Sequence, residues 1–74
     1  MKRRFELVEG SSSKFWEVEH TDGSATYVVR WGKRGTAGQE KTKTAASAAA
    51  AGKEVAKLVA EKAGKGYAEV GTPE

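Results

Sequence analysis

Cysteine is absent from this sequence, and histidine occurs once, as His20. The absence of cysteine excludes disulfides, thiolate zinc sites and thiol nucleophiles. A metal site built on His20 would need carboxylates, and nothing in the sequence groups any with it. The serines of residues 11–13 lie in a flexible run with no base held near them. We therefore expect no catalytic residues, no metal site and no cofactor, so that the protein is not an enzyme.

Long apolar runs are missing as well. No segment approaches the ~20 apolar residues that span a bilayer. Residues 5–9, behind the basic amino-terminal residues, lack the apolar core of a signal peptide. We expect a soluble, cytoplasmic protein with no membrane partner. The 74 residues suffice for a single domain over residues 1–74, whose core holds one sheet and one helix.

The first half of the chain alternates in the way that strands do. Residues 2–9 and 14–20 alternate between apolar and mostly charged side chains, and residues 25–31 are rich in β-branched and aromatic residues. Asp22 and Gly23 favour a hairpin, because such turns need positive φ angles. A meander of about three antiparallel strands follows from this pattern.

Two glutamates on the second of these strands are candidates for an acid–base pair. Glu17 and Glu19 share one face of their strand, and we interpret them as part of a solvated face rather than as an acid–base pair. A short polar strand over residues 39–43 then brings the predicted sheet to about four strands.

One long helix is predicted over residues 45–63, where alanine is abundant. Thr44 is a plausible N-cap, and Gly64 or Gly66 ends the helix. The apolar residues that repeat at three- and four-residue spacing are Ala48, Ala51, Val55, Leu58 and Val59. Residues 67–70 form either a last edge strand or a packing tail. The predicted fold class is α+β, with a mostly antiparallel sheet and one long helix packed across it.

Positive charge is concentrated in residues 30–43. The whole chain has a formal net charge of +3 and a pI near 9.3. Within residues 30–43, five cations face Glu40 alone, a net charge of +4; the cations are Arg30, Lys33, Arg34, Lys41 and Lys43. Trp31 stands among them at the end of a predicted strand. It either stacks on a base or sugar while the cations neutralise phosphates, or closes one end of the core beside ordinary surface charges.

Three glycines recur at three-residue intervals in residues 32–38, which we predict to be a loop or tight turn. Backbone amides in such a turn can form an anion-binding nest. Alternatively, glycine is needed here only because it readily adopts left-handed backbone angles. No Gly-Lys-Ser/Thr follows at the spacing of a P-loop.

Several of these segments together resemble the WGR domain family, which is named for a Trp-Gly-Arg motif. The resemblance covers roughly residues 3–70. It is carried by Phe15-Trp16-Glu17-Val18, by Tyr27-Val28-Val29-Arg30-Trp31-Gly32-Lys33-Arg34-Gly35-Thr36-Ala37-Gly38-Gln39, and by the Ala-rich helix with the following Gly64-Lys65-Gly66-Tyr67. The chain departs from the motif at Lys33, which replaces its arginine and lacks the planar guanidinium fork.

The resemblance implies a module that binds nucleic acid, DNA in preference to RNA, as such domains do in the poly(ADP-ribose) polymerases at DNA breaks. Trp31 would be the stacking residue, with Lys33 and Arg30 as phosphate or partner contacts. The surrounding Gly32, Arg34, Lys41 and Lys43 complete the expected binding segment. It also implies a bacterial stand-alone type of protein. The alternative function is a protein–protein interaction module without nucleic-acid contact, and either a monomer or a dimer fits.

Overall fold

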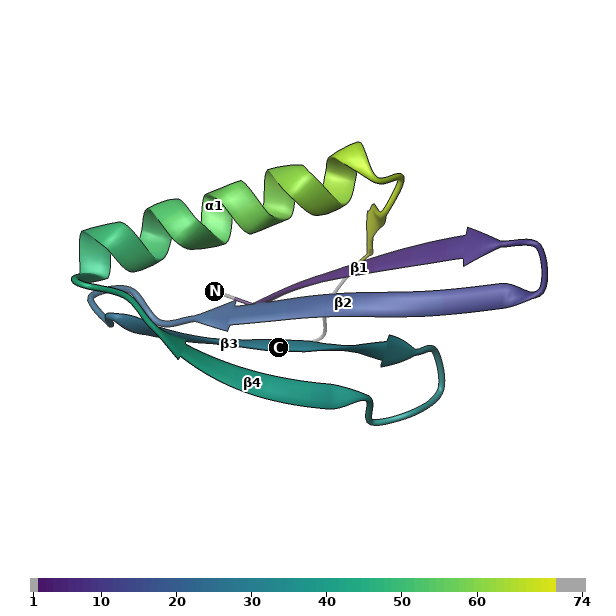
Figure 1. Cartoon of the computed structure of the whole chain (residues 1–74), viewed down its shortest axis with the longest axis horizontal. Coiled ribbons are helices and arrows are strands. Elements are labelled where there is room, and N and C mark those ends of the chain that lie inside the picture. The colour runs from purple at the N-terminus through teal and green to yellow at the C-terminus, as the bar shows by residue number, and fades with distance from the viewer. Residues whose placement is uncertain (1, 71–74) are drawn as a thin grey trace.

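A five-stranded sheet with one helix across it makes up the part of the chain that the structure, a computed structural model, describes, residues 2–70. The elements in chain order are β1 (Lys2–Glu9), β2 (Ser12–His20), β3 (Thr26–Lys33), β4 (Gln39–Thr44), α1 (Ala48–Gly64) and β5 (Ala68–Val70). Figure 1 shows α1 lying over one face of the sheet. The predicted α+β class is confirmed, with five strands where the sequence predicts about four.

All neighbouring strands of the sheet run antiparallel, in the order β4-β3-β2-β1-β5. β1 to β4 follow one another as a meander, as expected. β5 returns from the helix to pair with β1, from Arg4 opposite Val70 to Glu6 opposite Ala68. Of residues 67–70, for which the sequence leaves an edge strand or a packing tail open, Ala68–Val70 form an edge strand.

The helix begins later than the sequence predicts. Thr44 is not its N-cap, because this residue pairs with Thr26 as the last residue of β4, and Ala45 N–H donates to the Ala25 carbonyl at 2.8 Å. Ser47 caps the helix instead, and its hydroxyl accepts from the Ala50 N–H at 3.1 Å. Of the two glycines predicted to end the helix, Gly66 has the required left-handed conformation, with φ at 97°.

The core lies between α1 and the face of the sheet that it covers. Its buried members, all 5% exposed or less, are Phe5, Trp16, Val18, Tyr27, Val29, Ala51 and Val55. Ala51 and Val55 belong to the predicted apolar stripe, and Leu58 and Val59 of the same stripe pack against this core. The stripe prediction is confirmed for these four residues, and its fifth residue, Ala48, is partly buried. The small side chain of Ala51 suits close approach of helix to sheet.

The loop predicted over residues 32–38 is shorter in the structure. β3 continues through Lys33, so the connection to β4 consists of residues 34–38. Figure 1 shows this turn and the β1–β2 turn at the same end of the sheet, the end toward which α1 runs. Among residues 2–70, no helix has both the length and the apolar character needed to cross a membrane.

Candidate nucleic-acid interface

The predicted binding residues divide between the two faces of the sheet, since successive residues of a strand point to opposite sides. Trp31 pairs across the sheet with the core residue Trp16, and this register puts it on the helix side. Lys41 and Lys43 are also on that side, because they pair with the core residues Val29 and Tyr27. By the same alternation Lys33 is on the helix side as well. Arg30 lies on the opposite face of the sheet, which α1 does not cover and which we call the open face.

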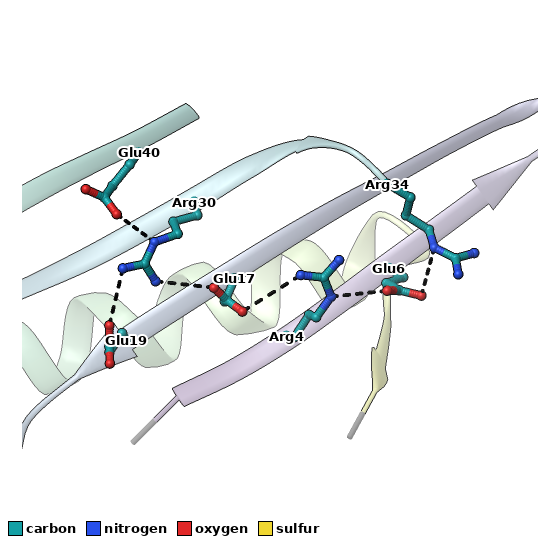
Figure 2. Close-up of polar contacts among 7 residues, drawn as sticks. All are labelled: Arg4, Glu6, Glu17, Glu19, Arg30, Arg34 and Glu40. Carbon is teal, nitrogen blue, oxygen red and sulfur yellow. Dashed lines mark hydrogen bonds and ion pairs between the residues drawn. The ribbon is translucent and has the colours of Figure 1, made fainter. Parts of the chain in front are cut away.

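The open face carries a chain of ion pairs that crosses four strands (Figure 2). Glu17, in the middle of β2, lies 3.3 Å from Arg30 Nη1 and 3.9 Å from Arg4 Nη1. Arg4 reaches Glu6 at 3.1 Å, and Glu6 also lies 3.4 Å from Nε of Arg34. With the ion pair from Arg30 to Glu40 on β4, the chain links β4 through β3 and β2 to β1, and then to the loop after β3.

Arg30 is the most heavily paired cation of this network. Its guanidinium lies 2.6 Å from Glu40, 3.3 Å from Glu17 and 3.5 Å from Glu19. The hydrogen bond to Glu40, followed by that to Glu17, raises the pKa of Arg30 above its ordinary value. Its charge is thus already balanced within the sheet, and the structure does not bring it together with Trp31.

The interpretation of Glu17 as part of a solvated face is wrong. The residue is only 7% exposed. Ion pairs with two arginines compensate its burial, because a buried carboxylate needs partners of opposite charge. Beside it, Phe15 is also buried on this face, and the guanidinium of Arg4 lies 4.4 Å from the centre of its ring.

A hollow of about 340 Å³ opens on the helix side, between β4 and the carboxyl-terminal half of α1. β4 contributes Lys41 and Lys43, and α1 contributes Leu58 and Lys62. The remaining lining residues come from β2 and β3 and are Trp16, Val29 and Trp31. We call this the lysine hollow, since three of its seven lining residues are lysines.

A second hollow of about 580 Å³ lies at the turn between β1 and β2. Its lining residues are Ser11, Ser12, Ser13, Lys14, Phe15, Trp31, Gly32, Lys33 and Tyr67. We call this the serine hollow. Lys14 and Lys33 are directly opposite each other on β2 and β3. Both hollows include Trp31, which therefore joins them.

Trp31 combines the two roles that the sequence leaves open. It packs against the buried core, so it does close this end of the hydrophobic layer. It is nevertheless only half-buried, and it lines both hollows. Part of its ring surface is thus available to a ligand, while the rest holds the side chain in place.

The lysines around Trp31 have no carboxylate partner among the residues 2–70 that the structure describes. They are Lys14, Lys33, Lys41, Lys43 and Lys62. Lys62 instead lies 5.7 Å from the ring centres of both Trp16 and Tyr67. The chain's arginines, Arg3, Arg4, Arg30 and Arg34, all form ion pairs. Uncompensated positive charge therefore lies along the helix side of the sheet, from Lys14 and Lys33 near the β1–β2 turn to Lys43, which is opposite Tyr27 near the start of β3.

Packing explains two of the three glycines in residues 32–38, Gly32 and Gly38. A Cβ on Gly32 would lie 2.8 Å from Gly38 Cα. A Cβ on Gly38 would collide with the Trp31 carbonyl oxygen and lie 2.8 Å from the Phe15 ring. Gly38 also has a φ of 69°. These two residues let the loop backbone close tightly on β3 beneath Trp31.

No group of three or more potential metal-ligating side chains occurs within the described part of the chain. His20 is buried, and its Nε2 lies 2.9 Å from the Ser24 carbonyl oxygen, to which it donates. This histidine therefore stabilises the turn between β2 and β3.

Two lysines and one tyrosine that line the hollows are missing from the sequence-based site: Lys14, Lys62 and Tyr67. Lys14 could have been found from strand alternation, because it shares a face with Trp16. Lys62 and Tyr67 come from the end of α1 and the segment after it, and their position in the hollows beside Trp31 depends on how the helix packs. No local sequence signal reveals that packing.

Comparison with known proteins relates the chain to one family. The family model described as WGR domain matches residues 1–74. Protein YehF of Escherichia coli (strain K12) is 45% identical over 67 residues, covering 90% of this chain and 24% of YehF. YfeS of the same organism is 38% identical over 69 residues, covering 93% of this chain and 28% of YfeS. The chain thus spans about a quarter of the length of these curated relatives.

The chain is also similar to a solved structure. The crystal structure of a Bacteroides fragilis protein superposes with a TM-score of 0.88 at 41% sequence identity. The match covers 95% of this chain and 19% of that protein.

Proposed function

Because the chain belongs to the WGR domain family, we propose that it is a small non-catalytic module that binds nucleic acid. We propose DNA rather than RNA as the partner, bound at ends or other structured sites through backbone contacts and stacking on Trp31. The absence of cysteine suits the reducing cytoplasm, where we place this activity.

The observation that carries the proposal is the set of unpaired lysines around a half-buried tryptophan. Lysines that neutralise phosphates release counterions, and this release supplies much of the affinity for DNA. An aromatic ring beside them adds stacking, which is tolerant of base sequence. Both components are present on the helix side of the sheet.

The position of α1 argues for backbone contact over base reading. Ala51 and Val55 on this helix are buried against the sheet, so the helix is held on the core. Helices that read bases lie in the major groove instead. Phosphate contacts fix a protein's position on DNA without reading its sequence. Recognition of a structure rather than of a sequence is the mode that fits.

We assign the DNA contacts to Trp31, Lys33, Lys41 and Lys43 among the residues expected from the sequence. Gly32 shapes the backbone beside them. In this proposal Arg30 and Arg34 stabilise the fold and do not contact DNA. The guanidinium of Arg30 is paired with Glu40, and that of Arg34, in the loop after β3, is paired with Glu6.

The test is a titration of the protein with a short blunt duplex and with closed circular DNA, each at low and at moderate salt. The double variant Lys41→Gln/Lys43→Gln removes two charges from the lysine hollow. The matched control is Lys53→Gln/Lys57→Gln, which removes the same charge from exposed positions of α1 outside both hollows.

We expect salt-sensitive binding that favours the duplex with ends and that weakens strongly in the hollow variant but little in the control. Each lysine contact should contribute about 0.9 to the slope of log affinity against log salt. Equal effects of the two double variants would remove the lysine hollow from the interface. Absence of DNA binding at low salt would leave the alternative, a protein partner, whose apolar interface would respond little to salt.

A further inference from the structure

The distance between two lysines on β4 matches the distance between consecutive phosphates of a nucleic-acid strand. Lys41 and Lys43 point to the same side of β4, two residues apart, which is about 6.8 Å along a strand. Consecutive phosphates of an extended, unstacked strand are separated by a similar distance. The side chains face the same hollow, with Lys62 of α1 also lining it.

The serine hollow carries an unfavourable pair of like charges. Lys14 and Lys33 are directly opposite on neighbouring strands, an arrangement that destabilises a sheet when nothing compensates it. No carboxylate within residues 2–70 pairs with either lysine. A bound anion would relieve the repulsion, so a phosphate here would complete the site.

Two half-buried aromatic rings accompany these lysines. Trp31 belongs to both hollows, and Tyr67 lines the serine hollow and lies near Lys62. Grooves that combine lysines along a backbone with rings on which bases stack are typical of proteins that bind single strands. The seven residues form what we call the strand track: Lys14, Trp31, Lys33, Lys41, Lys43, Lys62 and Tyr67.

From this arrangement we infer that the strand track receives one unpaired DNA strand, so that the preferred ends carry a single-stranded overhang. The inference rests on the proposed function and specifies its ligand. The lysine hollow, at about 340 Å³, lies near the lower limit of pockets that hold small ligands, about 300–1,000 Å³. It has room for a base or sugar, whereas a duplex is too wide to enter between β4 and α1.

The experiment compares four DNA molecules by fluorescence anisotropy, at low and at moderate salt. They are a blunt duplex, the same duplex with a 3′ overhang of thymidines, one with a 5′ overhang, and the thymidine strand alone. We expect at least one overhang to bind on the order of tenfold more tightly than the blunt end, from the stacking of one base. The thymidine strand alone should also bind measurably.

Variants on the helix and after it make the test specific. Lys62→Gln should reduce the preference for the overhang, and Lys57→Gln on the exposed part of the same helix should leave it unchanged. Tyr67→Leu should lose part of the overhang preference that Tyr67→Phe retains, because only the second keeps a ring for stacking.

The outcomes separate this inference from the proposed function. Salt-sensitive binding of the blunt duplex, with no gain from either overhang, would overturn the strand track and leave the proposed function standing. Equal losses in Lys62→Gln and Lys57→Gln would also overturn it. If none of the four molecules binds at low salt, the proposed function itself fails.

Discussion

The phenol of Tyr27 in β3 donates a hydrogen bond of 2.9 Å to Oε1 of Glu54 in α1. The tyrosine is buried with 3% of its surface exposed, whereas the glutamate is exposed. This contact fastens α1 to the sheet on which the hollows depend. Burial raises the pKa of Tyr27, and the hydrogen bond to Glu54 raises it further.

A prediction on alkaline stability follows from that pKa. Because the folded pKa is raised, the contribution of the phenol is fully present below the unfolded pKa of about 10 and is lost as pH rises through the folded pKa. Tyr27→Phe should cost about 1 kcal/mol at neutral pH and lessen the alkaline loss of stability. Urea unfolding of both proteins from neutral pH into the alkaline range measures this. A loss of equal steepness in the variant would contradict it.

For the ion pair between Arg3 and Glu69 we predict the opposite pH dependence, a loss of stability at acid pH. The hydrogen bonds from Arg3, at 2.8 and 2.7 Å, lower the pKa of Glu69, and the charge of the guanidinium adds to this effect. The contribution is therefore present above the unfolded pKa of about 4.3 and is lost as pH falls through the lower folded pKa.

Hydrogen exchange in the β5–β1 pairing is the measurement for this ion pair. In the wild type, protection of these amides should fall when the pH drops through the acid range. In Glu69→Gln the protection should be weaker already at neutral pH and should show less of that acid step. An unchanged acid step in the variant would assign it to other carboxylates.

Glu17 and Glu19 provide a matched pair for the open-face network. Both are on β2 and lie near Arg30, at 3.3 and 3.5 Å, but the side chain of Glu17 is 10% exposed and that of Glu19 is 46% exposed. Glu17→Gln should cost about 1–3 kcal/mol, because hydrogen bonds to charged groups are lost where water cannot replace them. Glu19→Gln should cost about 0–1 kcal/mol.

The comparison of these two variants is made by urea unfolding at low and high salt. Added salt should reduce the cost of Glu19→Gln and change that of Glu17→Gln little, since buried pairs are screened less. Similar costs for both would show that the burial of Glu17 does not control the energy of the network.

Sequence periodicity predicts much of this fold because burial follows it closely. The stripe with Ala51 and Val55 and the strand with Trp16 and Val18 both face the core as expected. Thr44 fails as a helix cap because pairing with β3 extends β4 through it. A local capping preference of about 1 kcal/mol is easily overridden by such tertiary contacts.

The site is harder to predict than the fold, and Arg30 and Trp31 show why. They are adjacent in sequence, yet strand alternation sends one to the open face and the other to the helix side. Counting charge over residues 30–43 conceals this division. Lys62 enters the same hollow as Lys41 only through the packing of α1, which no short segment encodes.

The loop glycines lead to a prediction about how Trp31 is held. Gly35 and Gly38 share one loop and both have positive φ, at 85° and 69°. A Cβ on Gly35 would meet nothing within 4 Å, whereas one on Gly38 would meet the Trp31 backbone and Phe15. Gly35→Ala should therefore cost about 1–2 kcal/mol from its backbone conformation alone.

Gly38→Ala should cost about 1–3 kcal/mol more than Gly35→Ala, because the added methyl group forces the loop away from β3. The displacement acts on the Trp31 carbonyl, so the tryptophan itself should shift. We expect a changed tryptophan emission spectrum and weaker DNA binding in the folded Gly38→Ala protein, with neither change in Gly35→Ala. Equal unfolding free energies and identical spectra for the two variants would mean that the loop adapts freely. The contact between Gly38 and Trp31 would then not position the stacking residue.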